Sequence, residues 1–211
     1  EVRWYAIIVL ASVGVCTLSL LNAYAPFEAL THGAFQVATI ITTTGYATMD
    51  FNLWHSAAKT VLVLLMFCGA CAGSTAGGIK LARLMLLAKN GRREIKYISQ
   101  PRAVISVKMN GKAVDDNVVR GAISYIIMYG MLFVITTLLI TAFDGVDLVT
   151  GFTSVATAIN NVGPALGEAT GSFDFYSAPS KLVLCFNMLA GRLELFPILM
   201  LLSPAAYKKH A

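Results

Sequence analysis

The stretch FEALTHGAFQVATIITTTGY, residues Phe27–Tyr46, joins a short apolar segment to a compact polar cluster. The apolar part, Phe27–Ile41, covers about 15 residues and would form a helix about 22 Å long. The polar part, Thr42–Tyr46, reads TTTGY and places three threonines before Gly45. A helix of that length is ordinary in a soluble protein but too short to cross about 30 Å of hydrocarbon. Its meaning therefore depends on the sequence around it.

The surrounding sequence is that of a membrane protein. The chain has 211 residues, of which 57% are hydrophobic and only 13% charged, whereas about a quarter of the residues in soluble domains are charged. Four apolar stretches are long enough to span a bilayer: Trp4–Phe27, Thr60–Ile79, Gly121–Phe143 and Leu182–Tyr207. We predict an integral, multi-pass protein of a lipid bilayer. Because Glu1 directly precedes the first stretch and is not a methionine, we expect a longer chain before it.

The distribution of charge predicts how these stretches are oriented. Ten of the 16 basic residues lie between Lys80 and Arg120, and Arg3, Lys208 and Lys209 mark the chain ends. Basic residues concentrate on the cytoplasmic side of membrane proteins. This places the N-terminus, the basic linker and the C-terminus in the cytoplasm. A basic linker could also indicate nucleic acid, but beside four spanning stretches topology is the favoured explanation, and we expect no nucleic-acid partner.

The chain repeats itself at an interval of 118 residues. The matches are Val37–Thr39 with Val155–Thr157, Ile41 with Ile159, and Gly45 with Gly163. Each half therefore consists of a spanning stretch, a short apolar segment, a small polar cluster with a glycine, and a second spanning stretch. Because the neighbouring stretches end on the same side, each short segment must enter the membrane and return. Such non-helical backbone at membrane depth has to be buried in protein or line a water-filled cavity.

The polar clusters have the composition of an ion filter. A re-entrant helix directs the negative end of its dipole at the membrane interior, which favours a cation there. Thr42, Thr43, Thr44 and Gly45 would supply consecutive carbonyl oxygens. Threonine accepts extended backbone, and Gly45 would adopt a conformation that aligns the carbonyl oxygens. Potassium channels replace the hydration shell of the ion by the carbonyls of TVGYG, and TTTGY is a similar sequence. The alternative is an outer turn that is merely rich in threonine and glycine.

The two clusters together predict where an ion binds. The predicted filter residues are Thr43, Thr44, Gly45, Asn161, Val162 and Gly163, and potassium would be coordinated by Thr43, Thr44, Asn161 and Val162. No organic cofactor is expected. The predicted fold class is an all-α membrane protein with two potassium-channel-like repeats of membrane helix, pore helix and membrane helix.

A glycine-rich segment interrupts the second spanning stretch of the first repeat. Ala57–Cys68 predicts a helix about 18 Å long, and in Gly69–Gly78 each glycine would cost a helix about 1 kcal/mol relative to alanine. We predict a broken inner helix here, with a movable gate below the filter. The gate residues would be Gly69, Gly73, Ser74, Thr75, Gly77 and Gly78, together with Arg192. The alternative is close helix packing through small residues.

Arg192 is the basic residue of the fourth apolar stretch and aligns with Cys71, at the level of this break. An arginine at that depth usually faces a cavity or a partner. We expect Arg192 to project toward the pore beneath the filter, as an electrostatic barrier to cations or as a ligand that holds the gate through its carbonyls. The alternative is a structural pair with Glu194 across a bend near Pro197.

These motifs resemble those of the Trk/Ktr/HKT superfamily of potassium transporters, most closely its bacterial TrkH group. The resemblance rests on TTTGY after a pore helix, AGSTAGG in the following helix, NNVGP and the late GRLE, and it covers the whole chain. It implies four repeats around one pore in a bacterial inner membrane. Residues 1–88 would be the third repeat, 89–117 a cytoplasmic basic linker, and 118–211 the fourth repeat. It also identifies Gly69–Gly78 as the intramembrane gate and Arg192 as its arginine.

The resemblance also implies partners. Two repeats cannot close a fourfold ring, so either two missing repeats or another copy must complete the pore. Family members form homodimers of complete subunits and associate with a cytosolic nucleotide-binding ring, TrkA-like, that controls opening. Residues 89–117 would be its docking region, with Val104–Met109 and Lys112–Val114 forming a hairpin around an Asn-Gly turn. A basic loop without such a structure is the alternative.

The predicted function is potassium transport through a carbonyl-lined filter that the glycine-rich segment gates. The alternative is a proton- or sodium-coupled potassium symport by the same pore, which would need ionisable residues beside the path. Only Arg192 and Glu194 lie within a spanning stretch, and this favours conduction. We predict no enzyme, because the histidines are scattered and no catalytic arrangement is suggested.

Overall fold

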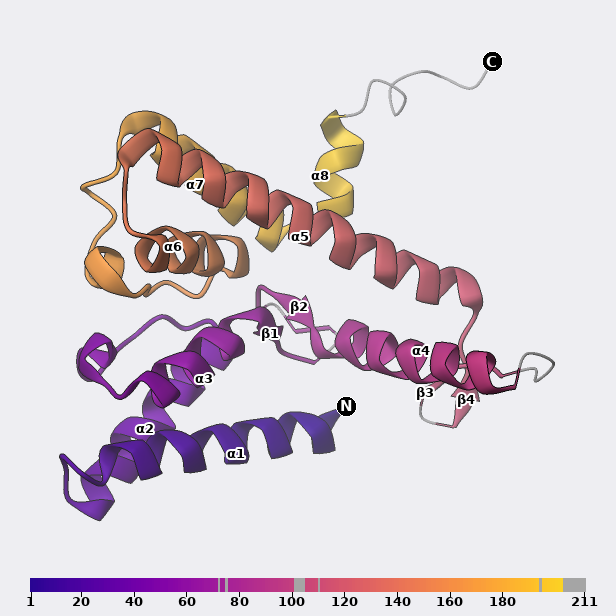
Figure 1. The fold of residues 1–211 in the computed structure, drawn as a ribbon, viewed down its shortest axis with the longest axis horizontal. Coiled ribbons are helices and arrows are strands. Elements are labelled where there is room, and N and C mark those ends of the chain that lie inside the picture. The colour runs from indigo at the N-terminus through magenta and orange to yellow at the C-terminus, as the bar shows by residue number, and fades with distance from the viewer. Residues whose placement is uncertain (72, 75, 101–104, 110, 194, 203–211) are drawn as a thin grey trace.

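The computed structural model describes residues 1–71, 73–74, 76–100, 105–109, 111–193 and 195–202 (Figure 1). Within these residues the chain is mostly helical and falls into two similar halves. The first half contains α1 (Val2–Leu20), α2 (Pro26–Ile41), the short turn η1 (Phe51–Leu53) and α3 (Ser56–Phe67). The second contains α5 (Asp116–Asp144), α6 (Leu148–Asn160), η2 (Gly167–Thr170) and α7 (Ala178–Arg192). α4 (Leu81–Ser99) joins the halves, and α8 (Leu195–Leu202) follows α7.

In the described part of the chain, α1 and α5 are the two helices long and apolar enough to cross a membrane. Their outward faces are apolar: Leu10 and Leu18 on α1 are 70% and 68% exposed, and Met131 and Leu138 on α5 are 59% and 63% exposed. A soluble monomer rarely carries an apolar surface of this extent. We therefore expect these apolar faces to contact lipid or further protein.

The two short helices begin with residue types that favour helix starts. Pro26 is the first residue of α2, where its missing N–H costs nothing. Asp147 caps α6, and its carboxylate accepts a hydrogen bond of 3.1 Å from the Val149 amide. α2 has 16 residues and α6 has 13, so both are shorter than a bilayer is thick. The predicted short helices are confirmed.

The halves meet between α3 and α6. Figure 1 shows the first half, in indigo and purple, and the second half, from pink through orange to yellow, with the β1–β2 segment between them. The largest buried apolar cluster crosses the junction, since it joins Leu62 and Met66 of α3 to Ala156 of α6 and to Val162 beyond it. The end of α6 is therefore surrounded by both halves.

The predicted break in the inner helix of the first half is confirmed. α3 ends at Phe67, and β1 (Cys68–Gly69) then pairs in parallel with β2 (Ile79–Lys80). This short ladder closes the glycine-rich segment between them into a loop, and α4 starts directly after it at Leu81.

The second half is interrupted as well, which the prediction of a break in the first repeat alone did not include. α7 ends at Arg192 and α8 begins at Leu195. Pro197 supplies the physical reason. In a continuous helix its nitrogen would donate to the carbonyl of Leu193, but proline has no N–H and its ring would collide with that carbonyl.

The connection between the halves is partly helical. α4 runs through residues 88 and 89, where the sequence suggests a boundary between repeat and linker. β3 (Lys108–Met109) and β4 (Lys112–Ala113) then form the predicted hairpin in shortened form. Val104 and Asn110 lie outside the described residues. Leu86, Val107, Val119 and Ala122 form an apolar cluster that holds the hairpin against α4 and α5.

Candidate functional site

α2 ends in a turn that reverses the chain at TTTGY. The Thr44 amide donates to the Thr39 carbonyl at 2.9 Å, and the Thr43 amide donates to the Ile40 carbonyl at 3.1 Å. This pairing is the Schellman motif, whose residue after the helix is left-handed. Thr43 accordingly has φ 55°, so the prediction of extended backbone is wrong at this residue. The free carbonyls at the helix end require these donors, and the left-handed conformation costs a non-glycine residue about 1–2 kcal/mol.

α6 ends in the same turn, 118 residues later. The Val162 amide donates to the Thr157 carbonyl at 3.0 Å, and the Asn161 amide to the Ala158 carbonyl at 3.2 Å. Asn161 has φ 54°, a conformation that asparagine tolerates better than threonine does. Here the Thr157 hydroxyl also accepts a hydrogen bond of 2.8 Å from the Gly163 amide. The interval between the two turns equals the sequence repeat.

The two turns touch each other through glycines. Gly45 and Gly163 have φ 85° and 115°, in the region that favours glycine. A Cβ at Gly45 would lie 2.7 Å from the Val162 carbonyl oxygen, and one at Gly163 would lie 3.1 Å from the Gly45 Cα. Both the backbone conformation and the lack of space therefore require glycine at these two positions.

All six predicted filter residues line one cavity of about 360 Å³. Its lining consists of Thr43, Thr44, Gly45, Thr157, Asn161, Val162, Gly163 and Met188. Two of these were not assigned from the sequence. Thr157 stands in the repeated Val-Ala-Thr and could have been found there, whereas Met188 comes from α7 and carries no sequence signal. Among these lining residues none has an ionisable side chain.

The glycine-rich loop packs against the end of α6. A Cβ at Gly77 would overlap the Asn160 carbonyl oxygen, and one at Gly78 would lie 3.2 Å from the Asn160 Oδ1. Asn160 is fully buried. Its Oδ1 accepts a hydrogen bond of 2.8 Å from the Tyr129 hydroxyl, and its Nδ2 donates to the Ala156 carbonyl at 2.8 Å. Asn160 is thus held in place by its hydrogen bonds, and it connects the loop to the turn that follows α6.

The lysine at the end of β2 binds carbonyl oxygens of the glycine-rich loop. Lys80 Nζ donates to the carbonyl oxygens of Ser74 at 2.7 Å and of Ala76 at 2.5 Å. The Ser74 amide donates to the Cys71 carbonyl at 3.1 Å, and the Ser74 hydroxyl accepts from the Ala76 amide at 3.2 Å. Sequence reasoning assigned neither Lys80 nor Tyr129, because each acts on residues that no local pattern connects to it.

The remaining predicted gate glycines occupy different parts of the loop. Gly69 lies at its base, where a Cβ would come within 2.8 Å of the Gly77 carbonyl oxygen. Gly73 has φ 87°, and a Cβ there would have none of the other described residues within 4 Å. Thr75 lies outside the described residues. The base of the loop is therefore tightly packed, whereas the described structure leaves space for a side chain at Gly73.

Arg192 is the last residue of α7, and its side chain is exposed in the chain as described. The residue before it, Gly191, packs so closely on α6 that a Cβ there would overlap the Ile159 carbonyl oxygen. Asn161 Nδ2 donates to the Met188 carbonyl at 3.1 Å. The end of α7 is thus docked beside the turn after α6. The predicted partner Glu194 lies outside the described residues.

Comparisons with known proteins identify the family of this chain. Residues 5–209 match the family model described as "TrkH: Cation transport protein". The chain belongs to this family. The family is one of transporters and not of enzymes.

Two curated relatives illustrate the match. The chain is 36% identical over 203 residues to the Trk system potassium uptake protein TrkH of Halomonas elongata, covering 96% of this chain and 41% of the relative. It is 35% identical over 205 residues to the Trk system potassium uptake protein TrkG of Escherichia coli, covering 96% of this chain and 42% of the relative. The chain therefore spans about two-fifths of the length of these relatives.

A solved structure shows the same fold. The crystal structure of the potassium transporter TrkH from Vibrio parahaemolyticus superimposes with a TM-score of 0.89 and 37% identity. The match covers 98% of this chain and 44% of that one. The two interrupted helices and the two short helices therefore belong to a known membrane transporter fold.

Proposed function

We propose that this chain forms half of a potassium-conducting pore, in which α2 and α6 are re-entrant pore helices and the turns after them are the filter. The observation that carries the proposal is the contact between two matching turns through Gly45 and Gly163, beside a shared cavity. Thr43, Thr44, Asn161 and Val162 would offer backbone oxygens to the ion, as the carbonyls of potassium channels do. Each repeat is then a membrane helix, a pore helix and an interrupted membrane helix.

Electrostatics support a cation in this cavity. α2 and α6 both end at the turns that line it. The C-terminal end of a helix is equivalent to about half a negative charge, so two helices direct partial negative charge at one place. None of the described residues that line the cavity has an ionisable side chain. This favours conduction over proton- or sodium-coupled symport, because coupling usually depends on ionisable groups beside the path.

The glycine-rich loop is the proposed gate. Gly77 and Gly78 lie against Asn160, directly before the filter residues of the second repeat. Displacement of the loop would separate it from the filter and would require Lys80 to release the carbonyls of Ser74 and Ala76. The further gate candidates remain Gly69, Gly73, Ser74, Thr75 and Arg192.

The proposal requires further protein. Because the chain spans about two-fifths of its relatives, we infer that two more repeats or a second copy complete the filter. We further propose a homodimer of complete subunits in a bacterial inner membrane, with the N-terminus, residues 89–117 and the C-terminus in the cytoplasm. A cytosolic nucleotide-binding ring, TrkA-like, would regulate the gate, in line with the Trk system named in the relatives.

Isotope flux through the intact protein in proteoliposomes tests the function. We expect potassium flux that follows the potassium gradient and reverses with it, at any proton or sodium gradient. Flux that follows a proton or sodium gradient instead would establish the coupled symport. Empty liposomes and liposomes with protein inactivated by heat are the controls, and equal potassium flux in all samples would exclude both functions.

A further inference from the structure

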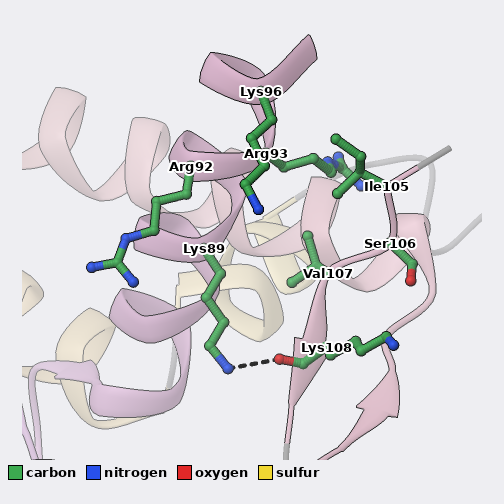
Figure 2. Close-up of a pocket in the computed structure, with 8 residues that line it drawn as sticks. All are labelled: Lys89, Arg92, Arg93, Lys96, Ile105, Ser106, Val107 and Lys108. Atoms are coloured by element: carbon green, nitrogen blue, oxygen red, sulfur yellow. Dashed lines mark hydrogen bonds between the residues drawn. The ribbon is translucent and has the colours of Figure 1, made fainter. Parts of the chain in front are cut away.

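A second cavity lies beside the middle and C-terminal half of α4, away from the gate loop that precedes this helix. It has a volume of about 170 Å³ and lies between α4 and the segment before β3 (Figure 2). Its lining consists of Lys89, Arg92, Arg93, Lys96, Ile105, Ser106, Val107 and Lys108. On α4, Lys89, Arg93 and Lys96 are three or four positions apart and share one side of the helix, whereas Arg92 is next to Arg93 and its side chain points away from the segment of residues 105–108 (Figure 2).

The cavity has a defined wall. Lys89 Nζ donates to the Lys108 carbonyl oxygen at 2.6 Å, which ties α4 to the segment that forms the other side (Figure 2). Val107 is only 4% exposed and packs with Leu86 and Val119. The position of Lys108 is therefore set by both a hydrogen bond and apolar contacts.

Positive charge exceeds negative charge around this cavity. Arg93 Nη1 lies 2.5 Å from an Asp116 carboxylate oxygen, and its Nε lies 3.8 Å from a Glu94 carboxylate oxygen. The hydrogen bond to Asp116 is the first cause of a raised pKa of the Arg93 guanidinium. Both acids act on the same arginine, and the neutral carbonyl that Lys89 contacts cancels no charge. A ligand with negative charge would therefore be attracted here.

The cavity lies where the sequences of α4 and α5 change between apolar and charged residues. Lys89 follows the apolar run Leu84–Ala88 of α4 directly, and the uncharged part of α5 begins at Gly121. On α4, beyond the first basic residues, Ile95 and Ile98 are 67% and 83% exposed. α4 packs against the end of the spanning helix α5, and basic residues beside exposed apolar ones are typical of a helix at the membrane–water interface. Phosphate-bearing headgroups occupy this level.

We propose that this cavity binds a phosphate group, and that the headgroup of an anionic phospholipid in the cytoplasmic leaflet supplies it. Lys96 is the residue for the decisive test, because it lines the cavity from α4, whereas Lys89 and Arg93 also support the hairpin and Asp116. The site is independent of the filter and the gate, so it stands even if the proposed conduction does not.

Native mass spectrometry of the intact protein, delipidated in detergent, tests the proposal. Phosphatidylglycerol should bind more tightly than phosphatidylcholine, which has the same phosphate but no net charge. A basic residue near a membrane surface contributes about 1 kcal/mol to the attraction of anionic lipid, so Lys96→Gln should weaken phosphatidylglycerol binding about fivefold. Lys96→Arg should retain binding. Lys112→Gln, at an exposed residue outside the cavity, makes the same change in net charge and should have less effect.

Titration with inorganic phosphate distinguishes the two sources. Phosphate that binds the lipid-free protein and displaces phosphatidylglycerol only at high concentration supports the lipid headgroup as the occupant. Phosphate that binds more tightly than the lipid, with the same dependence on Lys96, retains the site but assigns it to a soluble phosphate compound. Equal losses in Lys96→Gln and Lys112→Gln would overturn the proposal, because they would show diffuse surface attraction. Equal binding of phosphatidylglycerol and phosphatidylcholine, without phosphate binding, would overturn it as well.

Discussion

Substitution of Gly77 by alanine tests whether contact with α6 keeps the glycine-rich loop in place. The added Cβ would overlap the Asn160 carbonyl oxygen. Asn160 cannot easily move away from the added methyl group, because it is fully buried and hydrogen bonded to Tyr129 and Ala156. The φ of Gly77 lies outside the left-handed region, so alanine suits its backbone. The collision therefore acts on the position of the loop.

The expected magnitude follows from the cost of overpacking. An extra methyl group in a well-packed site costs about 1–3 kcal/mol. If the displaced loop escapes this penalty, the equilibrium shifts toward displacement by about 5- to 150-fold. We expect Gly77→Ala to raise potassium flux under conditions in which the original protein is mostly closed.

Isotope flux in proteoliposomes at equal protein content measures the effect. Gly73→Ala is the matched control, since it adds the same methyl group to the same loop. Gly73 has φ 87°, but none of the other described residues lies within 4 Å of the added Cβ, so alanine strains the backbone there without touching α6. Size-exclusion profiles and thermal unfolding establish that both variants are folded.

Two results would refute this reasoning. A folded Gly77→Ala protein with unchanged flux would show that the contact with Asn160 does not control the gate. Equal increases in Gly77→Ala and Gly73→Ala would assign the effect to general strain in the loop.

Three further predictions concern the filter and its supports. Gly45→Ser should raise sodium flux relative to potassium flux in competition experiments, because its Cβ would lie 2.7 Å from the Val162 carbonyl oxygen; unchanged selectivity would remove Gly45 from the filter. Tyr129→Phe removes the hydrogen bond of 2.8 Å to Asn160 and should cost about 1 kcal/mol of stability, measured as a lower Tm, whereas an unchanged Tm would make that bond energetically neutral. Arg192→Ala should raise cation flux if the arginine is a barrier, and the same flux as the original protein would rule that role out.

Local sequence signals predicted the short helices and the broken helix of the first half. Pro26 and Asp147 are residues that begin helices, and the glycines of Gly69–Gly78 disfavour one. The repeat interval was also readable, and it reappears in the matching left-handed residues Thr43 and Asn161. The left-handed conformation of Thr43 itself was not predictable from residue type, because threonine disfavours it and only the unpaired carbonyls at the end of α2 enforce it.

The sequence could not predict the contacts between residues that lie far apart in the chain. Tyr129 on α5 fixes Asn160, and Gly77 in the loop touches the same residue. Neither distance along the chain corresponds to a helix or strand period, so no pattern links these residues. Met188 reaches the filter cavity for the same reason, since α7 docks beside the turn after α6.

The sequence by itself determined the membrane class, the two repeats and the positions of the polar turns, because these depend on hydropathy, spacing and residue conformation. The tertiary structure alone decided that the two turns meet through Gly45 and Gly163, and that the loop rests on Asn160. The reason is steric. A glycine in the sequence signals only that a side chain is absent, and the fold determines which backbone occupies the space left free.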